Sequence, residues 1–491
     1  MSRPPRKPTS TARFIRFRVR MLFLVLPLIW LMMALAIGAP LDGRVEAEIR
    51  GSGAASRALW GVYAKDLASG QVLADVNGQK LFIPASNRKL VSTAMAARYL
   101  KDEALVTVIH VPTIQSGGVV PGDLVVEAVG DPTWNASFLR APGRSQLTSL
   151  ARQVAQSGVR RVTGNLVIDA SRFTDPAPEP ETWTLSDFQA NYGAIASVFG
   201  IDRNLGRVTL TPTTPGNPID VGFVGASAPF KIYNLAQTGE VDSAPTIQLF
   251  RGLDGEELEV TGRLPKGSRD GSRALPLGRP VEFAAKELYA ALAEEGVTVD
   301  GSIVIAESDR AEGQVIAEVR GAALGEILEE TNLESDNYLA ESLYLLAGRE
   351  LFAKGSYEAS HAAEKTFWRS FPVESDEWVG EDGSGLSRRN LITPHALVEL
   401  LGGMNENTLF VNSLPVSGHN GTLRYRLSKD GMAGKVMAKT GTLTGVTALS
   451  GYITPGDGRV VAFSVLVNNH ASSSTPIRRV VDEIVMVLAG K

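Results

Sequence analysis

The sequence contains no cysteine, which excludes disulfide bonds, thiolate metal sites and a cysteine nucleophile. Histidine is also scarce, with five residues. Their positions are scattered and show none of the spacings typical of metal ligands. We therefore expect no metal and no cofactor. Basic runs are missing beyond the first 20 residues, so the composition gives no sign of nucleic-acid binding.

The N-terminus differs from the rest of the chain. Residues 1–20 contain seven basic and no acidic residues, and residues 21–38 form one continuous apolar run. This pattern is typical of a secretory signal whose positive end stays in the cytoplasm. Residues 34–36 (Ala-Leu-Ala) offer a small-x-small cleavage site, but the run is also long enough to remain as a membrane anchor. We expect residues 1–38 to be a basic head with a signal peptide or anchor.

Export by this segment would place the body of the protein in the periplasm or extracytoplasmic envelope, with membrane contact only through residues 1–38. Without that segment the chain has 42 basic and 53 acidic residues, a net charge of −11. A body of this length exceeds what one hydrophobic core usually serves, so we expect two or more domains.

Strand patterns occur at both ends of the body and helices lie next to them. The sequence predicts two pairs of strands joined by turns: 59–67 with 71–76, and 446–454 with 459–468. Apolar helices are expected at residues 86–100 and 476–488. The two ends therefore predict one antiparallel sheet covered by helices, an α+β arrangement.

The middle of the chain has a different character. Residues 103–279 are strand-like and rich in Gly and Pro turns, with one convincing helix at 146–157. We expect a β-rich inserted domain there, and a discontinuous catalytic domain made of residues 45–102 and 280–491.

Three short motifs occur once each along the chain. They are Ser86-Asn87-Arg88-Lys89, Ser335-Asp336-Asn337 and Lys439-Thr440-Gly441. Each has an ordinary structural explanation: a helix start with a solvated lysine, a helix N-cap, and an edge lysine before a turn glycine. Their joint occurrence, in the order helix start, interhelical loop and strand, instead favours a catalytic site.

The first motif suits a serine nucleophile. Residues i and i+3 at a helix start share a face, so the Ser86 hydroxyl and the Lys89 amine can meet. A serine hydroxyl needs an adjacent base, and an ordinary lysine is protonated at neutral pH. Burial and a second cation, expected from Lys439, would have to bring the pKa of Lys89 down to about 7.

The motifs and several longer segments make the chain resemble the class C low-molecular-mass penicillin-binding proteins, the D-alanyl-D-alanine carboxypeptidase/endopeptidase family. The supporting segments are residues 130–132 (GDP), 164–169 (GNLVID), 382–387 (DGSGLS), 421–423 (GTL) and 438–443 (AKTGTL). The resemblance covers most of residues 60–468. It implies a penicillin-binding, serine β-lactamase-like transpeptidase fold, with a large insert between the first two motifs.

The resemblance also implies roles for the motif residues. Ser86 would be the acyl-enzyme nucleophile, Lys89 the general base and Ser335 the proton relay. The substrates would be peptidoglycan stem peptides ending in D-Ala-D-Ala, and β-lactams would be covalent inhibitors. Two alternatives remain: a β-lactamase or esterase on the same fold, and a non-catalytic wall-binding module.

The remaining motif residues are expected to bind substrate. By the resemblance, Asn337 orients the substrate amide, while Lys439 and Thr440 hold the terminal carboxylate. Gly441 would let the strand backbone come close to the peptide. The backbone N–H groups of Ser86 and Thr442 would form the oxyanion hole.

Overall fold

The computed structural model describes residues 1–2 and 41–491, apart from positions 227, 253, 270, 457 and 472. The expected signal peptide or anchor therefore lies almost wholly outside the described residues. Within the part of the chain that is described, no helix is long and apolar enough to cross a bilayer.

A five-stranded antiparallel sheet is built from both ends of the chain, as the sequence predicts. Across the sheet, its strands are β2 (Val72–Val76), β1 (Leu59–Asp66), β23 (Val461–Asn468), β22 (Val446–Ile453) and β21 (Val436–Leu443). Strand β1, near the start of the body, pairs with β23, near its end, along its full length. The two ends of the body therefore contribute adjacent strands to one sheet.

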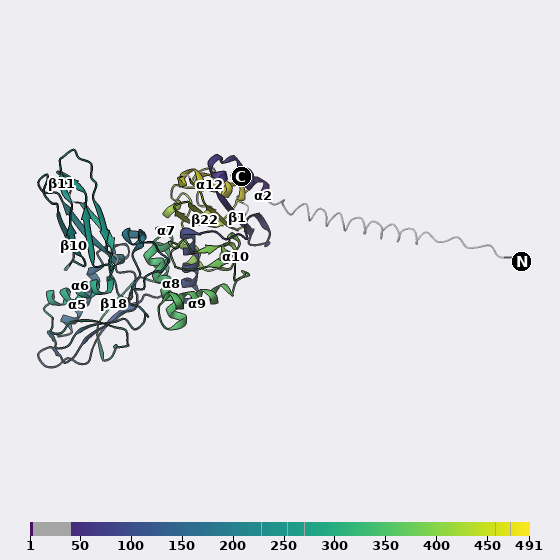
Figure 1. The fold of residues 1–491 in the computed structure, drawn as a ribbon. Coiled ribbons are helices and arrows are strands. Elements are labelled where there is room, and N and C mark those ends of the chain that lie inside the picture. Colours follow the sequence, from purple (N-terminus) through teal and green to yellow (C-terminus); the bar gives the residue numbers. More distant parts are fainter. Residues whose placement is uncertain (3–40, 227, 253, 270, 457, 472) are drawn as a thin grey trace.

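Helices cover both faces of this sheet (Figure 1). One face carries α2 (Asp42–Gly51) and α12 (Ser474–Leu488). The other side contains α3 (Lys89–Tyr99), α7 (Leu324–Leu333), α8 (Asn337–Phe352), α9 (Tyr357–Trp368), α10 (Pro394–Met404) and α11 (Thr408–Asn412). Successive strand residues point to opposite faces, so Phe463 packs toward α12 while Ala462 packs toward α10. The α+β fold predicted from the sequence is confirmed.

The inserted region is built on a second five-stranded sheet. Its strands, in order, are β17 (Ile303–Ala306), β7 (Leu166–Asp169), β5 (Leu124–Glu127), β3 (Val106–Val111) and β18 (Gln314–Arg320). Two helices, α5 (Arg144–Gln156) and α6 (Pro280–Glu294), share a hydrophobic core with it.

Residues 280–320, which we expected in the catalytic part, lie instead with the insert. Strand β17 pairs with β7, and β18 pairs with β3. Helix α6 buries Phe283 and Leu288 in the insert's core. The sequence did not separate this helix from those that follow, because an apolar helical pattern does not say which sheet it will cover.

Smaller sheets complete the insert, and those around β10 and β11 form a lobe that projects beyond α6 (Figure 1). Their strands are β8 (Leu205–Thr211), β9 (Asp220–Val224), β15 (Gly271–Pro276), β10 (Lys231–Asn234), β12 (Gln248–Arg251), β13 (Glu257–Thr261), β11 (Gln237–Gly239), β14 (Arg263–Pro265), β4 (Val119–Val120), β6 (Arg161–Val162) and β16 (Thr298–Val299). These strand pairings show that the insert is rich in β-structure, as the sequence predicts.

Phe463 tests the core between the terminal sheet and α12. Its side chain is fully buried on the central strand β23. We expect Phe463→Ala to lower the free energy of unfolding by about 3–5 kcal/mol, because it leaves a cavity in a packed core, and Phe463→Leu to cost less. Urea unfolding followed by tryptophan fluorescence measures both; equal stabilities for all three proteins would contradict this packing.

Candidate active site

The first motif lies in a short 3-10 turn, η2 (Ala85–Arg88), that leads directly into α3. Asn87 ties this turn to the sheet: its side-chain amide donates to the Lys439 carbonyl at 2.6 Å. The hydroxyl of Ser450 on β22 donates to Asn87 Oδ1 at 3.0 Å. These bonds fix Ser86, which is only partly buried, at the junction of helix and sheet.

Lys89 is fully buried beneath Ser86 and contacts three oxygen atoms. Its Nζ lies 3.0 Å from Ser86 Oγ, 2.6 Å from Asn337 Oδ1 and 2.8 Å from the Ser384 carbonyl. Burial lowers the pKa of Lys89 to about 8, although the carboxylates of Asp382, Glu341 and Asp336 act in the opposite direction.

Either protonation state of the amine can make these three contacts, and in the neutral state they leave its lone pair for Ser86. An uncharged lysine has two N–H donors and one lone pair, whereas the ammonium form has three donors. Asn337 Oδ1 and the Ser384 carbonyl can only accept, so they take the two N–H groups of the neutral form. The lone pair is then left to face Ser86 Oγ.

The other two motifs meet each other beside this pair. Lys439, fully buried on β21, donates from Nζ to Ser335 Oγ at 2.8 Å and to the Thr440 carbonyl at 2.9 Å. Burial lowers the pKa of Lys439 well below its usual value, and the charge of Lys89 lowers it further. We expected charge repulsion to lower the pKa of Lys89, but in the structure it lowers the pKa of Lys439 instead.

Asn337 connects the site to the insert. While its Oδ1 accepts from Lys89, its Nδ2 donates to the Tyr192 carbonyl at 2.9 Å. Both ends of this amide are thus engaged within the protein, although we expected it to contact substrate. A second insert residue, Trp183, donates from its indole to Asp382 at 2.9 Å.

Strand β21 forms the opposite wall. A Cβ placed on Gly441 would lie 2.8 Å from the Pro84 carbonyl and 3.1 Å from the Ser86 nitrogen, so only glycine allows the strand this close to η2. The Thr440 hydroxyl donates to Thr422 at 2.9 Å. Arg478, from α12, donates to the exposed Thr442 hydroxyl at 3.3 Å and brings a cation that the sequence did not reveal.

A cleft of about 670 Å³ opens over these residues. Its lining includes Ser86, Asn337, Tyr192, Asp187, Arg388 and Thr442. The cleft thus brings Ser86 and Asn337, from the first two motifs, to one opening with Thr442, which follows the third motif, and adds side chains from the insert.

The loop 382–387 supports the site from beneath, a role that the sequence did not reveal. The buried Asp382 carboxylate accepts from the backbone N–H groups of Gly385 at 2.8 Å and Ser387 at 2.7 Å. Glu341, also buried, accepts from Gly383 at 2.9 Å and Ser384 at 2.7 Å. Two carboxylates therefore hold the loop whose Ser384 carbonyl contacts Lys89.

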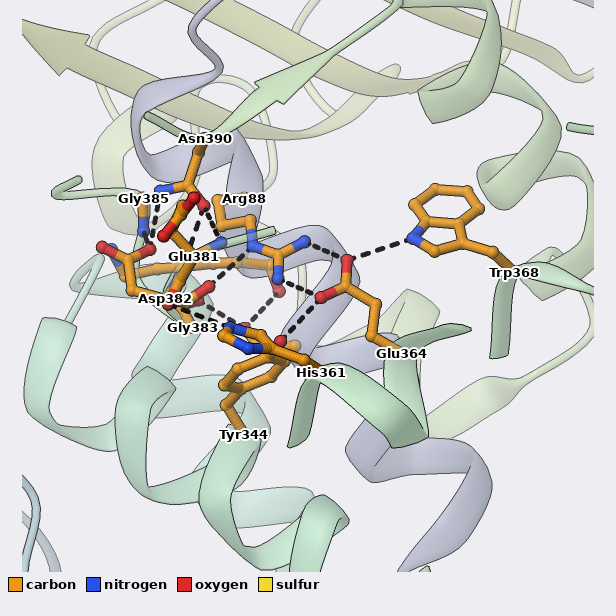
Figure 2. Close-up of polar contacts among 12 residues, drawn as sticks. Arg88, Tyr344, His361, Glu364, Trp368, Glu381, Asp382, Gly383, Gly385 and Asn390 are labelled. Atoms are coloured by element: carbon orange, nitrogen blue, oxygen red, sulfur yellow. Dashed lines mark hydrogen bonds and ion pairs between the residues drawn. The ribbon is translucent and has the colours of Figure 1, made fainter. Parts of the chain in front are cut away.

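A buried ion pair lies behind this loop (Figure 2). The Arg88 guanidinium pairs with both oxygens of Glu364 and donates to the Asp382 carbonyl at 2.7 Å. Glu364 also accepts from Tyr344 at 2.7 Å and Trp368 at 3.1 Å. Burial alone would raise the pKa of Glu364, but the guanidinium holds it below its usual value. Arg88 thereby links η2 to α8 and α9.

Removing one partner of this pair should be costly. We expect Glu364→Gln to lower the free energy of unfolding by about 3–5 kcal/mol, because it leaves the Arg88 charge buried without a counter-ion. The double variant Arg88→Met with Glu364→Gln removes both charges and should recover part of the loss. Urea unfolding measures each variant, and a double variant less stable than Glu364→Gln alone would contradict this account.

Comparison with known proteins agrees with the geometry. The D-Ala-D-Ala carboxypeptidase 3 (S13) family matches residues 41–489. The D-alanyl-D-alanine carboxypeptidase of Actinomadura sp. (strain R39) is 32% identical over 430 residues, which cover 84% of this chain and 78% of that protein. The crystal structure of penicillin-binding protein 4 from Haemophilus influenzae is similar at a TM-score of 0.78 and 25% identity, over 88% of this chain and 96% of that one. The chain belongs to the D-Ala-D-Ala carboxypeptidase 3 (S13) family.

Proposed function

We propose that this protein is a serine-type D-alanyl-D-alanine carboxypeptidase that acts on peptidoglycan stem peptides through an acyl-serine intermediate and is inhibited by β-lactams. The observation that carries the proposal is the buried Lys89 amine, 3.0 Å from Ser86 Oγ, with its remaining contacts made to pure acceptors. Membership of the carboxypeptidase family favours this activity over a β-lactamase, an esterase or a non-catalytic wall-binding module.

Acylation begins with Lys89. Its neutral amine takes the hydroxyl proton of Ser86 as the oxygen attacks the penultimate D-Ala carbonyl. The tetrahedral oxyanion would lie between η2 and β21, where the backbone N–H groups of Ser86 and Thr442 are the proposed donors. The close approach at Gly441 supports this arrangement, since it brings the strand backbone against the serine.

The leaving D-Ala needs a proton and a cationic partner for its carboxylate. Because Lys439 donates to Ser335 Oγ, the hydroxyl hydrogen of Ser335 is available for the leaving nitrogen. Lys439 and Thr440 lie next to it on β21, and Arg478 adds a further cation beside Thr442. The proton that Lys89 gained then passes to the Ser335 oxygen, which restores both groups; water hydrolyses the acyl-serine, and the neutral Lys89 amine acts as base again.

The same chemistry applied to a cross-link ending in a D-Ala bond would give endopeptidase products. Mass spectrometry of muropeptides before and after treatment separates the two reactions: loss of one D-Ala indicates carboxypeptidase action, and conversion of dimers to monomers indicates endopeptidase action. Export to the periplasm or envelope, through residues 1–38, is part of this proposal because the substrate lies there.

Covalent labelling tests the nucleophile. We expect a fluorescent penicillin to give one adduct on Ser86, located by mass spectrometry of peptides, and we expect Ser86→Ala to give none. Ser302→Ala, an exposed serine in the insert, is the matched control and should label like the unaltered protein. An adduct that persists in Ser86→Ala would refute the assignment.

The pH dependence of acylation tests the base. Because burial lowers the pKa of Lys89 to about 8, the neutral fraction of its amine rises through that pH. The acylation rate should therefore increase roughly tenfold per pH unit below 8 and level off above it. Stopped-flow measurements with a chromogenic β-lactam follow this profile; a midpoint near 10, as for an exposed lysine, would show that the base is not a buried amine.

A further inference from the structure

We propose that Arg203, a residue of the insert, is a positioning residue that holds the Ser335 turn in its catalytic conformation. The proposal rests on the function proposed above and assigns the insert a part in the chemistry. It follows from two adjoining turns of unusual backbone conformation and from the guanidinium that joins them.

The backbone around Arg203 adopts a conformation that non-glycine residues avoid. Asp202, Arg203 and Asn204 have φ angles of +49°, +58° and +55°, three consecutive residues in the left-handed region. Such residues normally occur singly, and conformations of this kind persist only where the surroundings enforce them. Strain that is maintained in this way is concentrated at functional sites.

The surroundings do enforce this turn. Asp202 accepts from the backbone N–H of Gly143 at 2.7 Å. Asn204 is fully buried and donates to the Ile195 carbonyl and to Ser197 Oγ, both at 2.9 Å. The residues on either side of Arg203 are therefore fixed within the insert, and Arg203 is held pointing outward from it.

The Arg203 guanidinium reaches the catalytic part. Its Nε lies 2.5 Å from Asp336 Oδ2, and its Nη2 lies 2.8 Å from Glu330 Oε1. On the insert side, it donates to Asn135 at 3.2 Å and to Ser137 at 3.0 Å. The side chains of Arg203 and Asp336 are only 22% and 13% exposed, so water screens this pair less than a surface pair.

The two carboxylates stand at the two ends of the turn that carries Ser335. Glu330 lies in the last turn of α7, and Asp336 precedes α8 and caps it by accepting from Leu339 at 3.0 Å. Between them Ser335 has a φ of +59°, another left-handed non-glycine residue. A guanidinium that binds both ends at once prevents the turn from relaxing.

The residues on either side of Asp336, Ser335 and Asn337, both contact the lysines of the proposed mechanism. Ser335 Oγ contacts Lys439, and Asn337 Oδ1 contacts Lys89 at 2.6 Å. If the turn relaxed, Asn337, which orients the base Lys89, and Ser335, the proposed proton relay, would both be displaced. A displacement of about 1 Å in such groups can reduce catalysis about a hundredfold.

Three variants test the inference by their rates of acylation with a chromogenic β-lactam. We expect Arg203→Gln to lower the rate at saturation about 10- to 100-fold, while the concentration giving half the maximal rate changes less than about twofold. Arg203→Lys should recover part of the loss, because one ammonium reaches one carboxylate but not both. Arg161→Gln is the matched control, since its partner Asp300 also lies in the insert, remote from the motifs, and its rate should stay unchanged.

Thermal unfolding of the same proteins separates positioning from folding. The inference is supported if Arg203→Gln remains folded and Arg203→Lys has an intermediate rate. It is overturned if Arg203→Gln acylates at the unaltered rate, or if Arg203→Lys and Arg203→Gln lose rate equally in step with their unfolding temperatures. An unaltered protein that forms no adduct at all would instead refute the proposed function.

Discussion

A buried lysine amine enclosed by two acceptors and a hydroxyl is the constraint on which the rest of the site depends. Burial makes the charged form of Lys89 unfavourable, and the Asn337 and Ser384 oxygens use both N–H groups of the neutral form. Two further sets of contacts keep these atoms in place. The Asn87 bonds fix the helix start, and Glu341 fixes the loop that supplies the Ser384 carbonyl.

Burial and the neighbouring carboxylates have opposite effects on the pKa of Lys89. Asp382, Glu341 and Asp336 each favour the charged amine, yet burial still lowers the pKa of Lys89. Glu341 itself has a pKa raised to about 7, first by burial and then by Asp382. A carboxyl group that is less readily ionised perturbs the base less, while its oxygens still accept the backbone N–H groups of the loop.

Sequence reasoning reached the fold and the motif residues because their signals are local. The Ser86–Lys89 spacing, the Ser335 turn and the β21 lysine can be read from a few adjacent letters each. The supports could not be read in this way. Glu364 is 276 positions from Arg88, and Arg203 is 133 positions from Asp336, so these pairings exist only after the chain has folded. The placement of residues 280–320 with the insert was missed for the same reason, because strand pairing decided it.

The most direct test of the account is the protonation of Lys89 itself. Protein labelled with ¹³C at the lysine ε-carbons can be titrated by NMR, and the Lys89 signal is the one that disappears in Lys89→Arg. The account predicts that this signal titrates with a midpoint near 8, well apart from the exposed lysines. A midpoint near 10.4, the ordinary value for lysine, would contradict the central claim, because the neutral fraction able to accept the serine proton at pH 7 would then be roughly two hundredfold smaller.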